Sequence, residues 1–503
     1  MGSGITLLPL VLAALPPEGS GGRTRELAPG ISVLGSSDRF GSANLGWVAL
    51  PDQVVLIGAP ARELAARAID EAQARSGKPV RIAVLTQLRP GEREAAAFLS
   101  ERGIRLVATK ETARRLSAPR VEEFTGRLEI GQGAQRLEVL DLGHAAGPGD
   151  AAVYAPGAQV LFAGEVCANG PRAQLTGSST EGWLRSLEAL EKLPLKTVVP
   201  GFGSIGGREL LARQRSYLRE LRRQVAHLVS QGRPLADLTR EVRIDPERQV
   251  WMPYDDPQPE DLAHLHAELT VPQAPFGGRP PPAGGSRPRA LALIADRVHE
   301  PGHIEEALAP ALDRAGVEAS FAFDVRALGA ANLKAVGLLV VLRDGMVWPR
   351  GPQEPYQVWM TREQEQAVVD FVEPGGGFLV LHNAMGIYPE GGPYLKLIGG
   401  TYQGHGPLER FRVRVLDAGH PITRGVSEYE VADEQHTPRP EPGAVHLILE
   451  SRSDEGVAAA AGWVREVGKG RVAYLANGHT RESLAHPMVQ KLIENAARWC
   501  LRR

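Results

Sequence analysis

The segment Gly375-Gly-Gly-Phe-Leu-Val-Leu-His-Asn-Ala384 has the pattern of a buried strand that ends in polar side chains. A short, continuous apolar run fits a central strand of a parallel sheet, because helices cover such a strand on both faces. Similar runs occur at 290–295 and 337–342, and helical spacing follows at 304–315 and 361–373. This alternation predicts a parallel sheet flanked by helices in the second half of the chain.

The first half of the chain contains more strands and a less regular order of elements. Strand patterns occur at 30–34, 47–50, 54–57, 80–85, 105–108, 137–142, 151–154, 160–163 and 197–199. Helical patterns occur at 61–74, 91–101, 182–193 and 209–230. This order predicts a strand-rich α/β sandwich.

The clearest boundary in the sequence is residues 271–288, where six Pro and four Gly occur among eighteen residues. Such a segment cannot form a hydrophobic core and is typical of a semi-rigid linker. We therefore predict a signal peptide or disordered leader at 1–25, a first domain at 26–270, a linker at 271–288 and a second domain at 289–503.

Composition excludes several classes of protein. The chain of 503 residues has 43% hydrophobic and 23% charged residues, and its formal net charge is -2. We expect no nucleic-acid partner and no attraction to anionic membranes, because there is no excess of basic residues. The two cysteines, Cys167 and Cys500, exclude a disulfide framework and a Cys-rich zinc module.

The apolar run Ile5 to Leu15 is too short to span a bilayer, and no other segment is long and apolar enough. The run fits the core of a signal peptide, although Met1-Gly-Ser-Gly4 lacks the usual basic residue. A cleaved leader implies a periplasmic or secreted protein, and a disordered tail implies a cytoplasmic one. A homo-oligomer is compatible with these features.

Several segments of the first half resemble the metallo-β-lactamase superfamily. They include Leu27-Ala-Pro-Gly-Ile-Ser-Val-Leu34, Val54-Val-Leu-Ile57, Leu142-Gly-x-x-x-x-Pro-Gly-Asp150, Leu161-Phe-Ala-Gly164 and Val199-Pro-Gly201. The resemblance covers about residues 26 to 270. It implies an αββα sandwich.

The metal-binding motif of that superfamily is missing from this sequence. Its histidine-rich segment corresponds to Thr86-Gln-Leu-Arg-Pro-Gly-Glu92. The positions that carry ligands in the family hold Gln87, Arg89, Gly91, Glu92, Ala146, Glu165 and Phe202. Because zinc requires several imidazole, thiolate or carboxylate ligands, we predict no metal in this domain and no activity as a metallo-hydrolase.

The histidines are concentrated in the second half, where nine of the thirteen lie beyond the linker. Several polar groups directly follow predicted strands: His299, Arg343-Asp344, His382-Asn383 and Asn477-Gly-His479. The carboxyl ends of parallel strands form the ligand-binding edge of an open α/β sheet. We therefore expect these side chains to share one site.

Further segments of the second half resemble the ThuA-like (trehalose utilisation) domain from about residue 290 to 503. Besides the strand segment at 375–384, they include Leu397-Ile-Gly-Gly-Thr-Tyr-Gln-Gly-His405, Asp433-Glu-Gln-His436 and Gly468-Lys-Gly-Arg-Val-x-Tyr-Leu-Ala-x-Gly-His479. The resemblance implies a flavodoxin-like, class I glutamine-amidotransferase-like fold and an association with sugar metabolism.

In the amidotransferase version of this fold, the strand that corresponds to 377–381 ends in a nucleophilic cysteine, and here that position holds His382. We predict a His/Glu acid–base or metal-assisted site in place of a thiolate. The candidate catalytic residues are His382, His405, Glu434, His436 and His479. The candidate substrate-binding residues are His299, Arg343, Asp344, Asn383 and Asp433. A divalent metal is a candidate cofactor at His382, His405 and Glu434.

The function that we predict is carbohydrate processing by the second domain, joined to an inactive first domain that serves recognition or assembly. Isomerisation, elimination and hydrolysis of a sugar or sugar derivative remain open as reactions. The alternative is a non-catalytic two-domain protein that binds a sugar or another protein. The third alternative is an active metallo-hydrolase.

Overall fold

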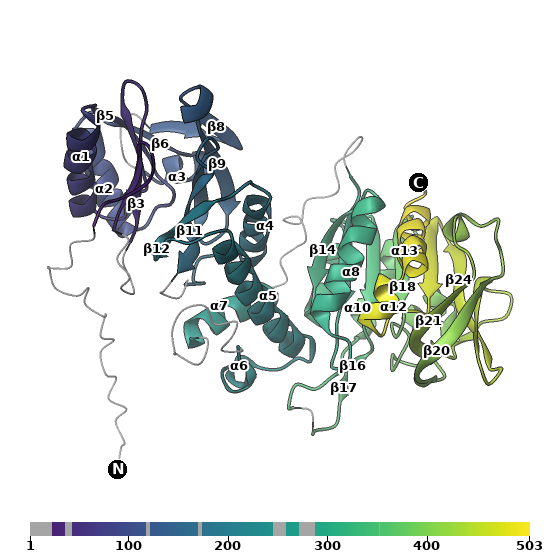
Figure 1. Cartoon of the computed structure of the whole chain (residues 1–503). Helices are drawn as coiled ribbons and strands as arrows, with labels where there is room; N and C mark the ends of the chain where they lie inside the picture. The colour runs from purple at the N-terminus through teal and green to yellow at the C-terminus, as the bar shows by residue number, and fades with distance from the viewer. Residues whose placement is uncertain are drawn as a thin grey trace, which may run out of the picture. The chain divides into compact units, whose positions relative to one another are not determined.

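The structure is a computed structural model that describes residues 23–35, 43–116, 121–169, 174–244, 258–270, 287–351 and 353–503 (Figure 1). The chain divides into two compact units, and the division falls between Arg215 and Ser216. Within the described residues, no helix is long and apolar enough to cross a membrane. The predicted leader core lies outside these residues, and so does the predicted linker except for Arg287 and Pro288.

The N-terminal unit contains two sheets. The first has the order β1-β2-β3-β4-β5-β6-β7, antiparallel from β1 to β4 and parallel from β4 to β7. Its strands are Arg25–Ala28, Ile31–Leu34, Leu45–Ala49, Val54–Ile57, Val80–Val84, Arg105–Thr109 and Val121–Phe124. The second has the order β12-β11-β10-β9-β8, and only its β11–β12 pair is parallel. Its strands β8 to β12 are Arg127–Ile130, Leu137–His144, Pro148–Ala155, Val160–Asn169 and Thr197–Gly203.

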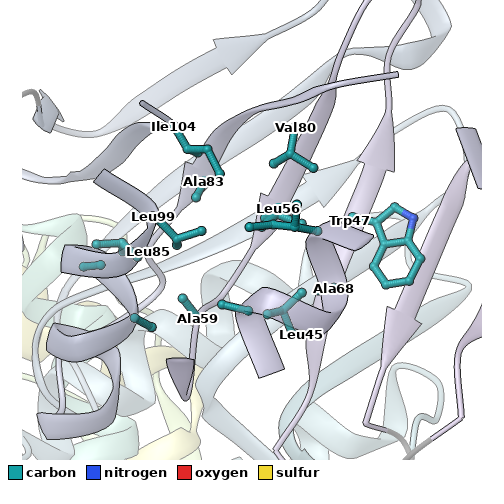
Figure 2. Packing of buried hydrophobic residues seen from close by; sticks show 14 of the residues in the cluster. Leu45, Trp47, Leu56, Ala59, Ala68, Val80, Ala83, Leu85, Leu99 and Ile104 are labelled. Carbon is teal, nitrogen blue, oxygen red and sulfur yellow. The ribbon is translucent and has the colours of Figure 1, made fainter. Parts of the chain in front are cut away.

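Hydrophobic side chains fill the space between these two sheets and the space between the first sheet and its helices. In β4, Val55 packs with the inter-sheet cluster, while Leu56 packs with the cluster that faces α1 and α2. Strand side chains alternate between the two faces, so a strand buried on both sides is apolar throughout. Figure 2 shows Leu56 beside Trp47 and Ala68 in the second cluster. The αββα sandwich is confirmed.

The helices of the N-terminal unit lie between its strands in sequence. They are α1 at Arg62–Ser76, α2 at Pro90–Glu101, α3 at Lys110–Arg114 and α4 at Thr180–Glu191. Helix α4 contacts β9 and β11 of the second sheet. Helix α5, Glu209–Ser230, begins in this unit and continues into the next.

The C-terminal unit is built on a nine-stranded sheet with the order β14-β13-β15-β18-β25-β24-β23-β20-β21. The first five strands in this order are parallel, as the sequence predicts, and the remaining four are antiparallel. The parallel strands are β13 at Arg289–Ile294, β14 at Glu318–Ala322, β15 at Leu338–Leu342, β18 at Gly377–Leu381 and β25 at Gly470–Leu475. The flavodoxin-like core is confirmed.

The four antiparallel strands correct one expectation. The sequence pattern between β18 and β25 looks irregular, but it forms strands that extend the sheet. They are β20 at His405–Val415, β21 at Tyr429–His436, β23 at His446–Ser453 and β24 at Ala458–Val467. Exposed and buried residues alternate along much of these strands, so they lack the continuous apolar run of a central strand.

Helices flank the parallel part of the sheet. They are α8 at Pro301–Arg314, α9 at Ala330–Leu333, α10 at Arg362–Val372, α11 at Pro393–Ile398, α12 at Arg481–Ala485 and α13 at Pro487–Cys500. Helices α8 and α13 lie side by side (Figure 1), and the Gln490 amide donates to the Ala307 carbonyl at 2.9 Å. Short strand pairs, β16 (Met346–Val347) with β17 (Gln357–Val358) and β19 (Gly400–Thr401) with β22 (Arg439–Pro440), complete the unit.

The compact C-terminal unit also includes chain that precedes the predicted linker. It takes in α5 from Ser216 onward, α6 at Leu235–Glu241 and α7 at Pro259–Thr270. Buried Leu221, Val225 and Leu262 are among its apolar side chains. The ranges 26–270 and 289–503 remain predictions for the two family domains.

Candidate functional site

Four neighbouring parallel strands deliver polar residues to one edge of the C-terminal sheet. Strands β13, β15, β18 and β25 are paired in register, so their carboxyl ends lie together. The residues that follow them include Asp296, Arg343, His382 and Asn477. Strand β21 adds Glu434 and His436. The site thus combines the edge of the parallel core with the antiparallel extension.

His382 occupies a strained position directly after β18. Its φ of 51° lies in the left-handed region, which is unusual for a residue other than Gly, Asn or Asp. The Nδ1 atom lies 2.9 Å from the Ala476 carbonyl, so it carries the proton, and the buried Nε2 has no hydrogen-bond partner. Burial, then the neighbouring His436, lowers the pKa of His382 well below its usual value. The ring therefore presents a free lone pair at neutral pH.

Glu434 is the point on which the imidazoles converge. Its Oε2 atom lies 3.2 Å from His479 Nδ1, 3.7 Å from His405 Nδ1, 3.8 Å from His382 Nε2 and 3.9 Å from His436 Nε2. Burial raises the pKa of Glu434, but contacts with His436 and His479 outweigh it and hold the pKa far below its usual value. The carboxylate is therefore ionised at neutral pH.

A second charged pair lies behind this carboxylate. His299 Nδ1 lies 2.8 Å from Asp296 Oδ1, and His299 Nε2 lies 3.1 Å from His479 Nδ1. Burial lowers the pKa of His299, but the ionised Asp296 outweighs it and raises the pKa. The Asn383 amide donates to Asp296 Oδ2 at 2.8 Å and fixes the carboxylate. Asp296, His299 and His479 thus form a continuous chain to Glu434.

Two groups of side chains could hold a metal ion within the part of the chain that the structure describes. One is His299, His382 and His479, and the other is His382, Glu434 and His436. In each group the ligand atoms lie within 4.8 Å of one another, and His382 belongs to both. Neutral imidazole and carboxylate suit Zn²⁺, Fe²⁺ or Mn²⁺. The buried, unpartnered Nε2 of His382 fits such a role.

The structure brings most of the predicted catalytic residues together and places His405 at the rim. His405 is paired across strands with His436, but its side chain is 40% exposed and its Nδ1 lies 2.7 Å from the Gly406 carbonyl. It is in neither of the two metal-ligand groups. The sequence-based ligand set was His382, His405 and Glu434. In the structure His436 takes the place of His405 in this set.

Asp433 supports the site. One carboxylate oxygen accepts from the backbone N–H of Gly478 at 2.9 Å, and the other accepts from that of His479 at 3.0 Å. The Ser483 hydroxyl donates to the same group. Asp433 is fully buried, so its contacts fix the loop that presents His479.

Arg343 and Asp344 lie deep beside the cluster. The buried Arg343 guanidinium donates to the carbonyls of Ser230 at 3.1 Å, Phe323 at 3.3 Å and Met346 at 3.4 Å. Burial, with the nearby Asp296 charge, raises the pKa of Asp344 to about 7. Asp344 is therefore a candidate proton carrier near neutral pH.

Two residues of the site were not among the candidates predicted from the sequence. Asp296 lies three residues before His299 at the end of β13, and this spacing was the available signal. Tyr402 has its ring 5.2 Å from that of His436, and burial with the Glu434 charge raises its pKa to about 12. An aromatic residue three positions before His405 gives no comparable signal in sequence.

The corresponding edge of the N-terminal unit has a different chemistry. The Gln87 amide donates to Glu92 at 2.7 Å, and Arg89 forms an ion pair with Glu165. At the start of α2 the Arg89 backbone N–H also donates to Glu92 at 2.8 Å. A small cavity nearby is lined by residues that include Asn44 and Gln87, whose buried side-chain oxygens have no hydrogen-bond partner.

Neither cysteine is placed to act as a nucleophile. Cys167 and Cys500 are both buried, and burial raises the pKa of each thiol to about 12. A reactive cysteine requires a thiolate near neutral pH. Cys500 lies on α13 and packs against the glycine that begins β18.

Comparisons with known proteins match the two halves of the chain to two different families. Residues 61–201 match the family model of the metallo-β-lactamase superfamily, and residues 291–500 match that of trehalose utilisation (ThuA). No curated protein matches the chain. The chain is a fusion of a metallo-β-lactamase-superfamily domain with a C-terminal ThuA domain.

Among solved structures, one similar protein is a metallo-β-lactamase from Pontibacter korlensis. It is 19% identical, with a TM-score of 0.36, and the match covers 39% of this chain and 98% of that one. Another is TMB-1, described in terms of substrate and inhibitor binding, which is 20% identical with a TM-score of 0.35 over 40% of this chain and 98% of that one.

Proposed function

We propose that the ThuA domain is an enzyme that processes a sugar or sugar derivative with a His/Glu acid–base or metal-assisted site. The observation that carries the proposal is the convergence of the His382, His436 and His479 rings on one Glu434 oxygen. Structural packing alone does not explain a buried imidazole nitrogen without a partner, because leaving such a group unsatisfied costs about 1–3 kcal/mol.

The chemistry that we propose is proton transfer at a hydroxyl-bearing or carbonyl-bearing carbon. The ionised Glu434 lies in contact with His479 and would orient this imidazole as the group that transfers the proton, while Asp296 orients and charges His299 behind them. Asp344 would act as a second proton carrier. A divalent metal held by His382, Glu434 and His436 would polarise a carbonyl or hydroxyl oxygen of the substrate.

For the N-terminal domain we propose a catalytically inactive scaffold that serves recognition or assembly. At the edge that would hold the metal, Arg89 pairs with Glu165, and Gln87 pairs with Glu92. A guanidinium at a ligand position opposes binding of a cation. Both convergent metal-ligand groups of the described residues lie in the ThuA domain.

The first test is metal analysis of the purified full chain with Co²⁺ titration of wild type, Glu434→Gln and His446→Gln. We expect Glu434→Gln to weaken Co²⁺ binding by about 10–100-fold or more. His446 pairs with Asp417 on an exposed surface, so His446→Gln should bind as wild type does.

The second test is turnover of a panel of keto-sugars and glycosides by the same three proteins. Loss of turnover by about 10²–10⁴-fold in Glu434→Gln supports an acid–base role. If both variants bind the metal and turn over sugars as wild type does, the proposed site is wrong. Saturable sugar binding without turnover would instead support the non-catalytic alternative. Stoichiometric zinc remaining in a Glu434→Gln/His382→Asn variant would contradict the inactive N-terminal domain.

A further inference from the structure

The C-terminal end of α5 contacts the chain that follows β15. The last two carbonyls of this helical segment, those of Ser230 and Gln231, accept from Arg343 at 3.1 Å and from the Trp348 N–H at 2.8 Å. Carbonyls at the end of a helix have no partner within the helix. Here residues of the ThuA domain satisfy them.

The local sequence at the end of α5 favours this contact. Gly232 has a φ of 72°, and the Arg233 N–H donates to the Leu228 carbonyl at 3.1 Å, which closes the helix in the manner of a Schellman motif. A Cβ added at Gly232 would lie 3.6 Å from Val347. The chain therefore leaves the axis of α5 at Gly232, next to the loop that follows Arg343.

Arg343 connects this helix end to the acidic residues of the site. Its side chain is fully buried, and the backbone N–H of the next residue, Asp344, donates to Asp296 Oδ2 at 3.1 Å. The negative end of a helix dipole stabilises a cation placed beside it. The α5 carbonyls thus help to hold Arg343, and with it the neighbouring backbone N–H that fixes Asp296 beside His299.

Three further contacts join the same segment to the ThuA domain. Arg223 pairs with Glu300 at 3.5 Å, the Arg222 guanidinium lies 5.9 Å from the Phe323 ring, and Arg326 donates to the Thr270 carbonyl at 3.2 Å. These contacts extend from α5 to the end of α7.

We infer that residues 216–244 and 258–270 are an integral wall of the ThuA domain, and that Arg343 is a positioning residue which links this wall to the Asp296–His299 pair. The Pro/Gly-rich segment at 271–288 then connects two parts of one folded unit. The association of these parts does not depend on which reaction the site performs.

The test is to insert a protease recognition sequence between Gly284 and Gly285 of the full chain and to cleave the folded protein. We expect the two fragments to elute together in size-exclusion chromatography. Separation of the wild-type fragments without denaturant would overturn the inference.

Two arginine variants of the cleavable protein form a matched pair. Arg343→Met removes a buried contact to α5, whereas Arg326→Met removes an exposed contact to α7. We expect dissociation of the cleaved fragments to increase at least about tenfold in Arg343→Met and to remain near wild type in Arg326→Met. Equal behaviour of the two variants would overturn the role of Arg343.

The positioning role has its own readout in the His299–Asp296 hydrogen bond. We expect a downfield imidazole N–H resonance of His299 in wild type and its loss in Arg343→Met. Arg343→Lys can still donate to one carbonyl, so it should restore part of this resonance, but it should not restore fragment association, because it lacks the forked donors. An unchanged resonance in Arg343→Met would show that the arginine does not position the pair.

Discussion

The two domains each place polar residues at a sheet edge, and they differ in which atoms remain without a partner. At the N-terminal edge the charged groups pair, and the unpartnered atoms are the amide oxygens of Asn44 and Gln87. At the C-terminal edge the unpartnered atoms include the imidazole nitrogens His382 Nε2 and His436 Nδ1. Amide oxygens suit water or hard cations, whereas neutral imidazoles suit transition metals and proton transfer. The two edges therefore differ in the kind of ligand that their unpartnered atoms can bind.

Among the substitutions that test this difference between the two edges, we expect the largest loss of activity at His382. Replacement of His382 by Asn removes the free Nε2 but tolerates the positive φ better than most residues do. Turnover should fall by about 10²–10⁴-fold. His382→Ala should lose the same activity and about 1 kcal/mol more stability, measured by chemical denaturation. If His382→Asn retains wild-type activity, the imidazole is not part of the chemistry.

The stability of the N-terminal domain should depend on pH because of a buried carboxyl group, that of Asp150. Burial, with the Glu165 charge, raises the pKa of Asp150 to about 8. This group binds its proton more tightly in the folded state, so its contribution to stability is complete below about pH 4 and is lost as pH rises through 8. Asp150→Asn stays neutral at every pH.

The free energy of unfolding of Asp150→Asn, relative to wild type, should therefore increase between pH 4 and 8 by at most about 1.4 kcal/mol per pH unit. Hydrogen exchange of the β10 amides in the full chain measures this difference. A difference that does not change with pH would show that Asp150 is ionised in the folded protein throughout this range.

Close packing at the C-terminal edge predicts a smaller effect for Gly478→Ala. A Cβ at this position would lie 2.8 Å from the Cβ of His382, so one of the two loops must move. We expect a loss of about 1–3 kcal/mol in chemical denaturation and weaker Co²⁺ binding. Gly329→Ala is the control, because no atom lies within 4 Å of its added Cβ. Equal stability of both variants would contradict the tight packing.

The smallest effect concerns the ion pair of the N-terminal edge. Arg89→Met leaves the buried Glu165 without its guanidinium, but that carboxyl already has a raised pKa and can take up a proton. The arginine is partly exposed, so we expect a loss of only about 1–2 kcal/mol in thermal unfolding. Arg93→Met, on the exposed side of α2, is the control. Stoichiometric zinc binding by Arg89→Met would show that this arginine alone blocks an otherwise intact site.

The parallel core and the strand-end residues could be predicted from sequence because both depend on local patterns. A continuous apolar run marks each central strand, and the residue after it must lie at the sheet edge, as for His382. The antiparallel extension was missed, since its strands are exposed along one side and lack that run. Asp296 contacts His299 locally, three residues along the chain, and that spacing was overlooked. The contacts from Asn383 and from the Asp344 backbone to its other oxygen are tertiary, and sequence spacing does not predict them.

The extension of the sheet also has a consequence for how this candidate site can change. Glu434 and His436 come from β21, the outermost strand of the extension, whereas His299, His382 and His479 follow strands of the core. Two of these five side chains therefore come from one peripheral strand, and Asp433 of the same strand accepts from the backbone of Gly478 and His479 in the loop after β25. A change in the outer strand would therefore alter both the carboxylate that the imidazoles surround and the position of His479, which belongs to the core.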